Sequence, residues 1–261
     1  MIAPSMLRDG AVASSPDPYD ALAPIYDAWQ EAAGTPFSHL VQARLEPLLA
    51  REAERRRTFA FADLGCGTGA LLHALRAAHP AWRLCGVDAS AAMLSQARRR
   101  DGSESTSWLR GRLESTLTPD SVDAAGAFFD ALNHLPDEAT LDRALASAAR
   151  AIRPGGVFVF DMTNRGGFER WWRGRGAWSG AGWKLETELS WDASRSTAHG
   201  HIAVTCAGTS TTAEIVERCF DAPAIRAALA AAGLEVAANE PWSPFAMDDP
   251  GKTWWVARKP G

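Results

Sequence analysis

The alternation of strand-like and helix-like segments between residues 58 and 161 constrains the fold most strongly. Short apolar runs are separated by stretches in which apolar residues recur at helical spacing. Because a helical crossover returns the chain to the same edge of the sheet, successive strands should run parallel. The predicted strands are residues 58–63, 83–88, 106–110, 121–129 and 157–161, and the predicted helices are residues 70–79, 90–100 and 137–153. The sequence therefore predicts an α/β fold with helices on both faces of a parallel sheet.

The alternation stops between Arg165 and Phe220, where the chain becomes rich in tryptophan and in antiparallel strand patterns. Three runs alternate between apolar and polar residues, at 183–191, 197–206 and 211–220. Five of the eleven tryptophans fall in this segment: Trp171, Trp172, Trp178, Trp183 and Trp191. We expect residues 165–220 to form a β-rich insertion that covers one end of the sheet.

The segments at the two ends of the chain complete the prediction. Residues 19–57 have helical spacing with a break near Gly34 and Pro36, and residues 1–18 are expected to be disordered. Near the other end, Asp221 is a plausible helix N-cap and Gly233 a plausible helix end. Two last strands, at 234–238 and 253–258, should extend the sheet.

The composition excludes several classes of protein. The formal net charge is −4 and the pI is about 5.9, so no overall positive field attracts nucleic acid or anionic lipid. The four cysteines show no CxxC spacing, which favours reduced thiols in a cytoplasm. No apolar run approaches the ~18 residues of a membrane span, and the first residues lack the apolar core of a signal peptide. We expect a soluble cytoplasmic protein.

The sequence DLGCGTG, at residues 63–69, lies where the first strand meets its helix. Glycines are needed where a turn requires positive φ and where a ligand approaches the backbone closely. Gly65, Gly67 and Gly69 give GxGxG spacing, whereas the dinucleotide fingerprint is GxGxxG. Asp88 ends the second strand, 19 residues after Gly69, where a carboxylate can accept hydrogen bonds from both hydroxyls of a ribose. The pattern therefore predicts an adenosine-type ligand.

These motifs together resemble the class I S-adenosylmethionine-dependent methyltransferases. Residues 63–69 match the first motif of that family, Gly86-Val87-Asp88 matches its ribose-binding acid, and residues 153–156 resemble its late helix-to-strand motif. Residues 220–236 are similar to its last helix and sixth strand. The resemblance spans residues 58–164 and 221–258. It implies a Rossmann-like, doubly wound sheet of seven strands with an antiparallel last strand.

The resemblance also implies three regions and a bound S-adenosyl-L-methionine. Residues 1–57 would be the start and a helical lid, residues 58–164 and 221–261 the cofactor domain, and residues 165–220 the substrate cover. The implied cofactor-binding residues are Tyr19, Asp63, Gly65, Cys66, Gly67, Gly69, Asp88, Ala89, Met93, Leu113 and Phe128. Arg112 departs from the family pattern, which often has an acid at this point, and receives no role.

The segment after the fourth strand, Phe128 to Leu135, bears on the methyl acceptor. It lacks the acid or amide, two prolines and aromatic residue of methyltransferases that act on bases, and it resembles the FDALN-type segment of small-molecule enzymes. Asp130, Asn133 and His134 are candidate catalytic residues here. His134 could equally be a helix-entry residue that bonds to nearby backbone.

Aromatic residues elsewhere are further candidates. Tyr26 is a candidate catalytic residue, although Tyr19 and Tyr26 share a helix face and could simply pack. Trp171 and Trp172 are candidate substrate contacts, because aromatic walls suit a planar or cationic acceptor. The same tryptophans could instead only hold a small sheet together.

We expect a methyltransferase that acts on a small molecule, with nitrogen favoured over oxygen as the acceptor and with positioning as the main catalytic effect. An O-methyltransferase with His134 or Asp130 as base, a NAD-dependent dehydrogenase and a non-catalytic binding protein are the alternatives. The expected partner is a small-molecule substrate, with no nucleic acid and no membrane, and the chain is a monomer or homodimer. His199 and His201 share one face of a strand without a clear third ligand, so we expect no metal.

Overall fold

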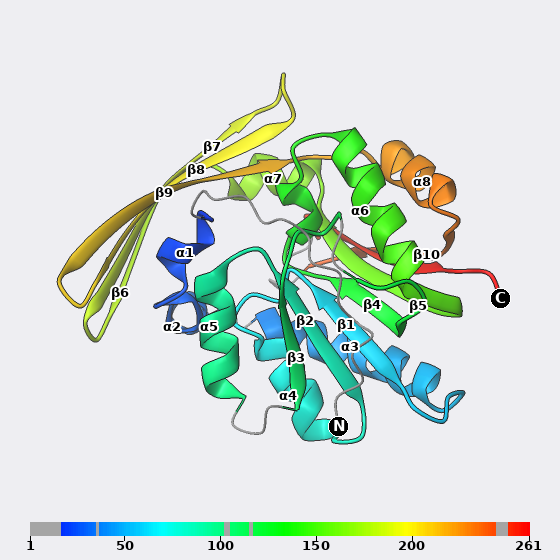
Figure 1. The fold of residues 1–261 in the computed structure, drawn as a ribbon. Helices are drawn as coiled ribbons and strands as arrows, with labels where there is room; N and C mark the ends of the chain where they lie inside the picture. The colour runs from blue at the N-terminus through cyan, green and yellow to red at the C-terminus, as the bar shows by residue number, and fades with distance from the viewer. Residues whose placement is uncertain (1–16, 35–36, 102–104, 115–116, 244–249) are drawn as a thin grey trace.

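A seven-stranded sheet forms the centre of the computed structural model, which describes residues 17–34, 37–101, 105–114, 117–243 and 250–261 (Figure 1). Its strand order is β10-β11-β5-β4-β1-β2-β3. The strands β1 to β5 pair in parallel, and β11 runs antiparallel to both β5 and β10. The bounds are β1 (Ala60–Leu64), β2 (Arg83–Asp88), β3 (Thr106–Arg110), β4 (Val122–Ala127), β5 (Ile152–Thr163), β10 (Glu235–Trp242) and β11 (Lys252–Arg258). The fold class predicted from the sequence is confirmed.

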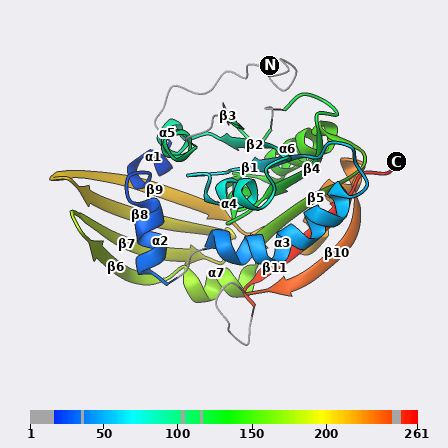
Figure 2. The ribbon, with the colours of Figure 1, turned by 90° about the horizontal axis from the view of Figure 1, so that it is seen from below.

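Helices cover both faces of this sheet (Figure 2). The first core contains residues of α6 (Glu138–Ala151) and α8 (Ala222–Ala231) against one face. The second core contains residues of α3 (Phe37–Ala53), α4 (Ala70–Ala78) and α5 (Ala91–Arg100) against the other. Because β1, β4 and β5 are buried on both faces, they read as continuous apolar runs in the sequence.

The N-terminal segment differs from the single broken helix that the sequence suggests. It contains α1 (Tyr19–Leu22), α2 (Tyr26–Ala32) and α3, and the chain turns between α1 and α2 at Pro24. Proline has no backbone N–H with which to continue the hydrogen bonding of α1, which explains this additional break. The predicted break at Gly34 lies just after the end of α2, whereas Pro36 lies outside the described residues.

A second, antiparallel sheet of four strands lies beside the first (Figure 1). Its strands are β6 (Gly174–Gly180), β7 (Trp183–Asp192), β8 (Thr197–Cys206) and β9 (Thr209–Arg218). The pattern predicts β7, β8 and β9 but misses β6, whose glycines and charged residues carry little strand signal. It also misses the short helix α7 (Arg165–Trp171), which Asn164 caps by accepting a hydrogen bond from Gly167 N–H.

One face of this second sheet packs on the N-terminal helices. Leu185, Ile202 and Ile215 form a core with Leu22 and Ile25. Helix α1 lies against β9 and α5, and α2 lies against β6. The helices α1 and α2 therefore bridge the two sheets. The division of the chain into three regions remains a prediction. In the part of the chain described here, no helix combines the length and apolar character needed to cross a membrane.

Candidate active site

A cavity of about 410 Å³ lies where the N-terminal helices meet the carboxyl ends of the parallel strands. Its walls come from α1 and α2, from the loops that follow β1, β2, β3 and β4, and from β9. Ligands of doubly wound sheets bind at this edge. The predicted residues that line it are Tyr19, Tyr26, Asp63, Gly65, Cys66, Gly67, Asp88, Ala89, Met93, Leu113, Phe128 and His134.

The glycine turn of residues 65–69 presents its backbone to the cavity. Gly65, Gly67 and Gly69 all have positive φ, at 82°, 53° and 73°. A Cβ added to Gly65 would lie 2.8 Å from the Ala131 side chain, and one added to Gly69 would lie 2.4 Å from the Trp108 ring. A Cβ at Gly67 would meet nothing within 4 Å. Gly69 therefore allows close packing behind the turn, whereas Gly67 leaves its ligand side open.

Asp88 faces the turn from the end of β2. Its carboxylate accepts hydrogen bonds from Gly67 N–H (2.8 Å) and Ser90 N–H (2.8 Å). Burial raises the pKa of Asp88 to about 6, although these two donors favour its ionised form. Burial, together with the nearby Asp88, raises the pKa of Asp63 to about 8, so Asp63 is mainly protonated at neutral pH. The site therefore holds one carboxylate and one carboxylic acid side by side.

The far end of the cavity, beyond Asp88, is apolar. Ala89 follows β2, Met93 lies in the first turn of α5, and Leu113 follows β3. Arg112 and Glu114 also line this end, with 3.6 Å between Arg112 Nε and Glu114 Oε1. Apolar side chains beside a buried carboxylate suit a purine ring and its ribose.

A buried polar cluster borders the cavity on the side away from this slot. His134 Nε2 lies 3.0 Å from the Tyr19 hydroxyl and 3.5 Å from Glu217 Oε1. Burial lowers the pKa of His134 despite a hydrogen bond to the Val216 backbone, so the imidazole is neutral at pH 7. Burial and the neighbouring Asp130 raise the pKa of Glu217 well above its usual range.

Glu217 is the residue of this cluster that the sequence reasoning missed. It is 5% exposed, and its Oε2 atom has no hydrogen-bond partner among the described residues. The signal was present, because Glu217 follows Ile215 on the buried face of an alternating strand. A carboxyl group on the buried face of a strand lowers the stability of the fold unless it belongs to a polar site.

Asp130 and Asn133 do not line the cavity. Asn133 is fully buried, donates to the Arg218 carbonyl (2.8 Å) and accepts from Thr163 N–H (3.0 Å). Asp130 accepts from Thr163 N–H (3.0 Å) and pairs with Lys252. Both hold the chain after β4 in place, and this arrangement gives no support to their predicted catalytic role.

The chain after β4 is strained as well as braced. Phe129 and Asp130 have φ of 57° and 65°, which is unusual for residues other than glycine. Asp161 compensates by accepting from Phe129 N–H (3.0 Å) and by pairing with Lys252 (3.0 Å). Backbone strain of this kind persists where surrounding contacts hold it, and here those contacts fix the path of the chain that leads to His134.

Three further predicted site residues lie outside the cavity lining. The Trp171 ring lies against Gly251, where an added Cβ would be 2.4 Å from it. Trp172 packs with Phe168, at 6.0 Å between ring centroids, and borders the core of the second sheet. Gly69 serves the packing described above. Substrate contact by the two tryptophans remains a prediction without support from this geometry.

The two strand histidines lie on the outer face of the second sheet. His201 Nδ1 is 3.4 Å from Glu214 Oε1, and both side chains are exposed. Across the residues that the structure describes, no group of three or more His, Cys, Asp or Glu side chains is arranged to hold a metal ion.

Comparison with known proteins agrees with this geometry. Residues 61–156 match the family described as a methyltransferase domain. A trans-aconitate 2-methyltransferase from Azoarcus sp. (strain BH72) is 38% identical over 101 residues, which is 38% of this chain and 37% of that protein. The matches to curated relatives cover only 28% and 37% of the length of those proteins.

Solved structures are similar over almost the whole chain. An S-adenosylmethionine-dependent methyltransferase from Clostridium acetobutylicum ATCC 824 superposes with a TM-score of 0.77 at 17% identity, covering 94% of this chain and 100% of that one. The sugar N-methyltransferase KedS8 from Streptoalloteichus sp ATCC 53650 has a TM-score of 0.68 at 24% identity, covering 97% and 99%. At these identities the likeness shows the fold.

The strand order and the superposition show that this chain has the fold of S-adenosylmethionine-dependent methyltransferases, and its residues 61–156 match a methyltransferase domain. The part of the chain that matches the methyltransferase-domain family, residues 61–156, contains the glycine turn, Asp88 and His134.

Proposed function

We propose that this protein transfers a methyl group from S-adenosyl-L-methionine to a nitrogen atom of a small molecule, and that the acceptor is an amino sugar. The observation that carries the proposal is the cavity itself, which joins a glycine turn and a ribose-binding acid to a buried Tyr19, His134 and Glu217 cluster. The likeness to a sugar N-methyltransferase supports the choice of acceptor.

The residues present fit the donor. Gly67 leaves an open cradle where any Cβ would stand between the backbone and a ligand, and its φ of 53° disfavours other residues. Asp88 would hold the ribose hydroxyls, while Ala89, Met93 and Leu113 would enclose the adenine. When bound, the donor would supply an electrophilic methyl group on its sulfonium, and its sulfur would keep the electrons of the broken S–C bond as a neutral thioether.

The protein's own contribution is to orient the acceptor and to receive its proton. An amine attacks only through a free lone pair, so the ammonium form must first lose a proton. A neutral His134 can take that proton, either directly or through the Tyr19 hydroxyl that contacts its Nε2. Glu217 Oε1 lies 3.5 Å from the same nitrogen; the charge of the imidazolium would lower the raised pKa of Glu217 and so favour the carboxylate that pairs with it. Helices α1 and α2 cover the cavity and exclude water.

Binding of the demethylated donor tests the first half of the proposal. S-adenosylhomocysteine at 100 times its dissociation constant should raise the free energy of unfolding by about 2.7 kcal/mol. Thermal unfolding of the full chain with and without the ligand measures this, and NAD serves as the control ligand. The proposal fails if neither S-adenosylhomocysteine nor S-adenosylmethionine stabilises the protein, and stabilisation by NAD alone favours a dehydrogenase.

The protonation state of His134 tests the second half. Its pKa is lowered, so the imidazole should titrate with a midpoint below 6.5 and be neutral at pH 7. Histidine ring resonances followed by NMR between pH 5 and 8 give the midpoint, and the His134→Gln variant identifies the resonance. A midpoint at or above 7 would mean a cationic imidazole, which could not accept the proton of an ammonium acceptor.

Transfer to a hydroxyl group is the second candidate, because the same neutral imidazole could act as general base toward an alcohol. A panel of simple amino sugars and their hydroxyl analogues, scored by formation of S-adenosylhomocysteine, separates the two acceptors.

A further inference from the structure

One apolar core joins α1 and α2 to the second sheet. The core that contains Leu22 and Ile25 also contains buried side chains of β7, β8 and β9. Among the described residues, Met93 of α5 is its one buried member from the main domain, by which we mean the seven-stranded sheet and the helices on its two faces. The two cores of the main domain contain no described residue of α1, α2 or the second sheet. Residues 17–32 and 174–218, here called the cap, therefore pack as one body.

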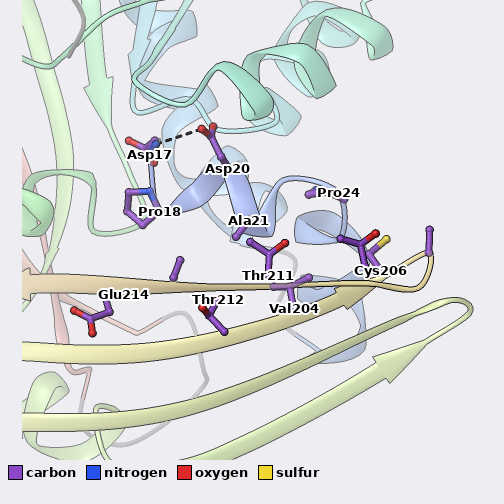
Figure 3. A pocket seen from close by; sticks show the side chains of 13 residues that line it. Asp17, Pro18, Asp20, Ala21, Pro24, Val204, Cys206, Thr211, Thr212 and Glu214 are labelled. Carbon is purple, nitrogen blue, oxygen red and sulfur yellow. Dashed lines mark hydrogen bonds between the residues drawn. The ribbon is translucent and has the colours of Figure 1, made fainter. Parts of the chain in front are cut away.

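Asp20 of α1 forms the first polar contact between the cap and the main domain. Its Oδ1 atom accepts from Ser90 Oγ (2.6 Å) and from Ala92 N–H (3.2 Å) at the start of α5. In Figure 3, Asp20 points from α1 away from β9, whereas Thr211 of β9 points toward α1. Ser90 is fully buried, and its N–H donates to the carboxylate of Asp88. Asp20 therefore binds the loop that presents Asp88 to the donor site.

Asp27 of α2 forms the second polar contact, with the glycine turn. Its Oδ1 atom accepts from Thr68 Oγ1 (2.7 Å), and its other oxygen pairs with Arg100 at the end of α5. Thr68 lies between Gly67 and Gly69 and is 2% exposed. The two carboxylates of the cap therefore contact the two loops that border the donor site, one carboxylate on each loop.

The boundary between the cap and the main domain passes through one cavity and not through another. A second cavity of about 710 Å³ lies between α1 and the hairpin end of β8 and β9 (Figure 3). Its described lining residues all lie between 17 and 24 or between 204 and 214, within the cap. The first cavity is lined by the cap on one side and by the loops after β1, β2, β3 and β4 on the other. Separation of the cap would open the first cavity and leave the second unchanged.

We propose that the cap opens as one body to admit the donor, and that Asp20 and Asp27 are positioning residues that hold it closed. Carboxylates and hydroxyls regain hydrogen bonds from water when they separate, whereas apolar side chains lose their packing. The polar boundary therefore breaks more readily than the core inside the cap. This inference concerns the donor and holds whichever acceptor is used.

Stopped-flow tryptophan fluorescence with S-adenosylhomocysteine and the full chain tests this inference. Asp20→Ala together with Asp27→Ala should raise the association and dissociation rate constants at least fivefold each, because the same opening precedes entry and exit. The ratio of the two constants should change less than twofold, because the contacts are lost equally in the free and bound protein. A rise in the dissociation rate constant alone overturns the inference, and so does no change in either constant.

The two single variants carry the same test if the double variant does not fold, and each should give a smaller rise in both rate constants. The matched control is Glu186→Ala on β7, a half-exposed acid of the cap that pairs with Lys184 and lines neither cavity. It should leave both constants unchanged, and an effect equal to that of the double variant overturns the inference. Failure of the unmodified chain to bind S-adenosylhomocysteine would contradict the proposed function instead, so the two failures are distinguishable.

Discussion

Replacing Lys252 by methionine is expected to lower the free energy of unfolding by about 3–5 kcal/mol, because it leaves buried carboxylates without their cation. Lys252 is 3% exposed and contacts both Asp130 and Asp161, the latter at 3.0 Å. Burial opposes its charge, but the two carboxylates outweigh burial and raise its pKa. Denaturant unfolding followed by circular dichroism measures the loss.

Lys184→Met is the matched control, since the half-exposed Lys184 pairs with the half-exposed Glu186 on the second sheet. It should change stability by no more than about 0.5 kcal/mol. Adding Asp161→Asn to Lys252→Met should restore part of the loss, because the most deeply buried charge is then removed as well. A loss below about 1 kcal/mol for Lys252→Met would mean that the pair does not hold the chain after β4.

Asp88→Asn is expected to weaken S-adenosylhomocysteine about 100-fold, which corresponds to about 2.7 kcal/mol. The proposed ribose hydroxyls donate to a carboxylate, and hydrogen bonds to a charged group contribute about 1.5–3 kcal/mol each. The backbone donors of Gly67 and Ser90 add to the loss, because an amide has only one acceptor oxygen for them. Titration calorimetry gives both affinities.

Asp88→Asn should also weaken the pH dependence of the affinity for S-adenosylhomocysteine. Since the pKa of Asp88 is about 6 in the free protein, the carboxylate becomes protonated as the pH falls below that value. Affinity should then fall about tenfold per pH unit below pH 6 in the unmodified protein and less steeply in Asp88→Asn. Asp120→Asn, a change of an exposed acid paired with Lys259, is the control for loss of a carboxylate. An unchanged affinity in Asp88→Asn would remove Asp88 from the proposed site.

The sequence predicted the sheet well because its signals are local. A buried parallel strand is a continuous apolar run, and the glycine turn and Asp88 each follow such a run directly. The strands that alternate in the second sheet were found for the same reason. Strand β6 was missed because its side chains give no period, and the break at Pro24 was missed because the apolar spacing continues through it.

The site was predicted less completely because contacts across the chain decide it. Tyr19 and His134 are 115 residues apart, and Glu217 is 83 residues beyond His134, so no spacing predicts that they meet. Asp130 looked like a base from its position after a strand. Its pairing with Lys252, 122 residues away, shows that it holds the chain after β4 in place instead. Sequence position places a residue at the correct edge, but packing decides which way it faces.

Helix α1 contacts both the start of α5, beside Asp88, and His134 at the other end of the site. Its Asp20 accepts hydrogen bonds from Ser90 and Ala92 at the start of α5, directly after Asp88, the proposed ribose ligand. Its Tyr19 contacts His134, and Asp17 before it borders both cavities. A donor that fixes the start of α5 thereby also fixes the wall that the acceptor meets. Binding of the two substrates should therefore be cooperative and ordered, with the donor entering first and leaving, demethylated, last.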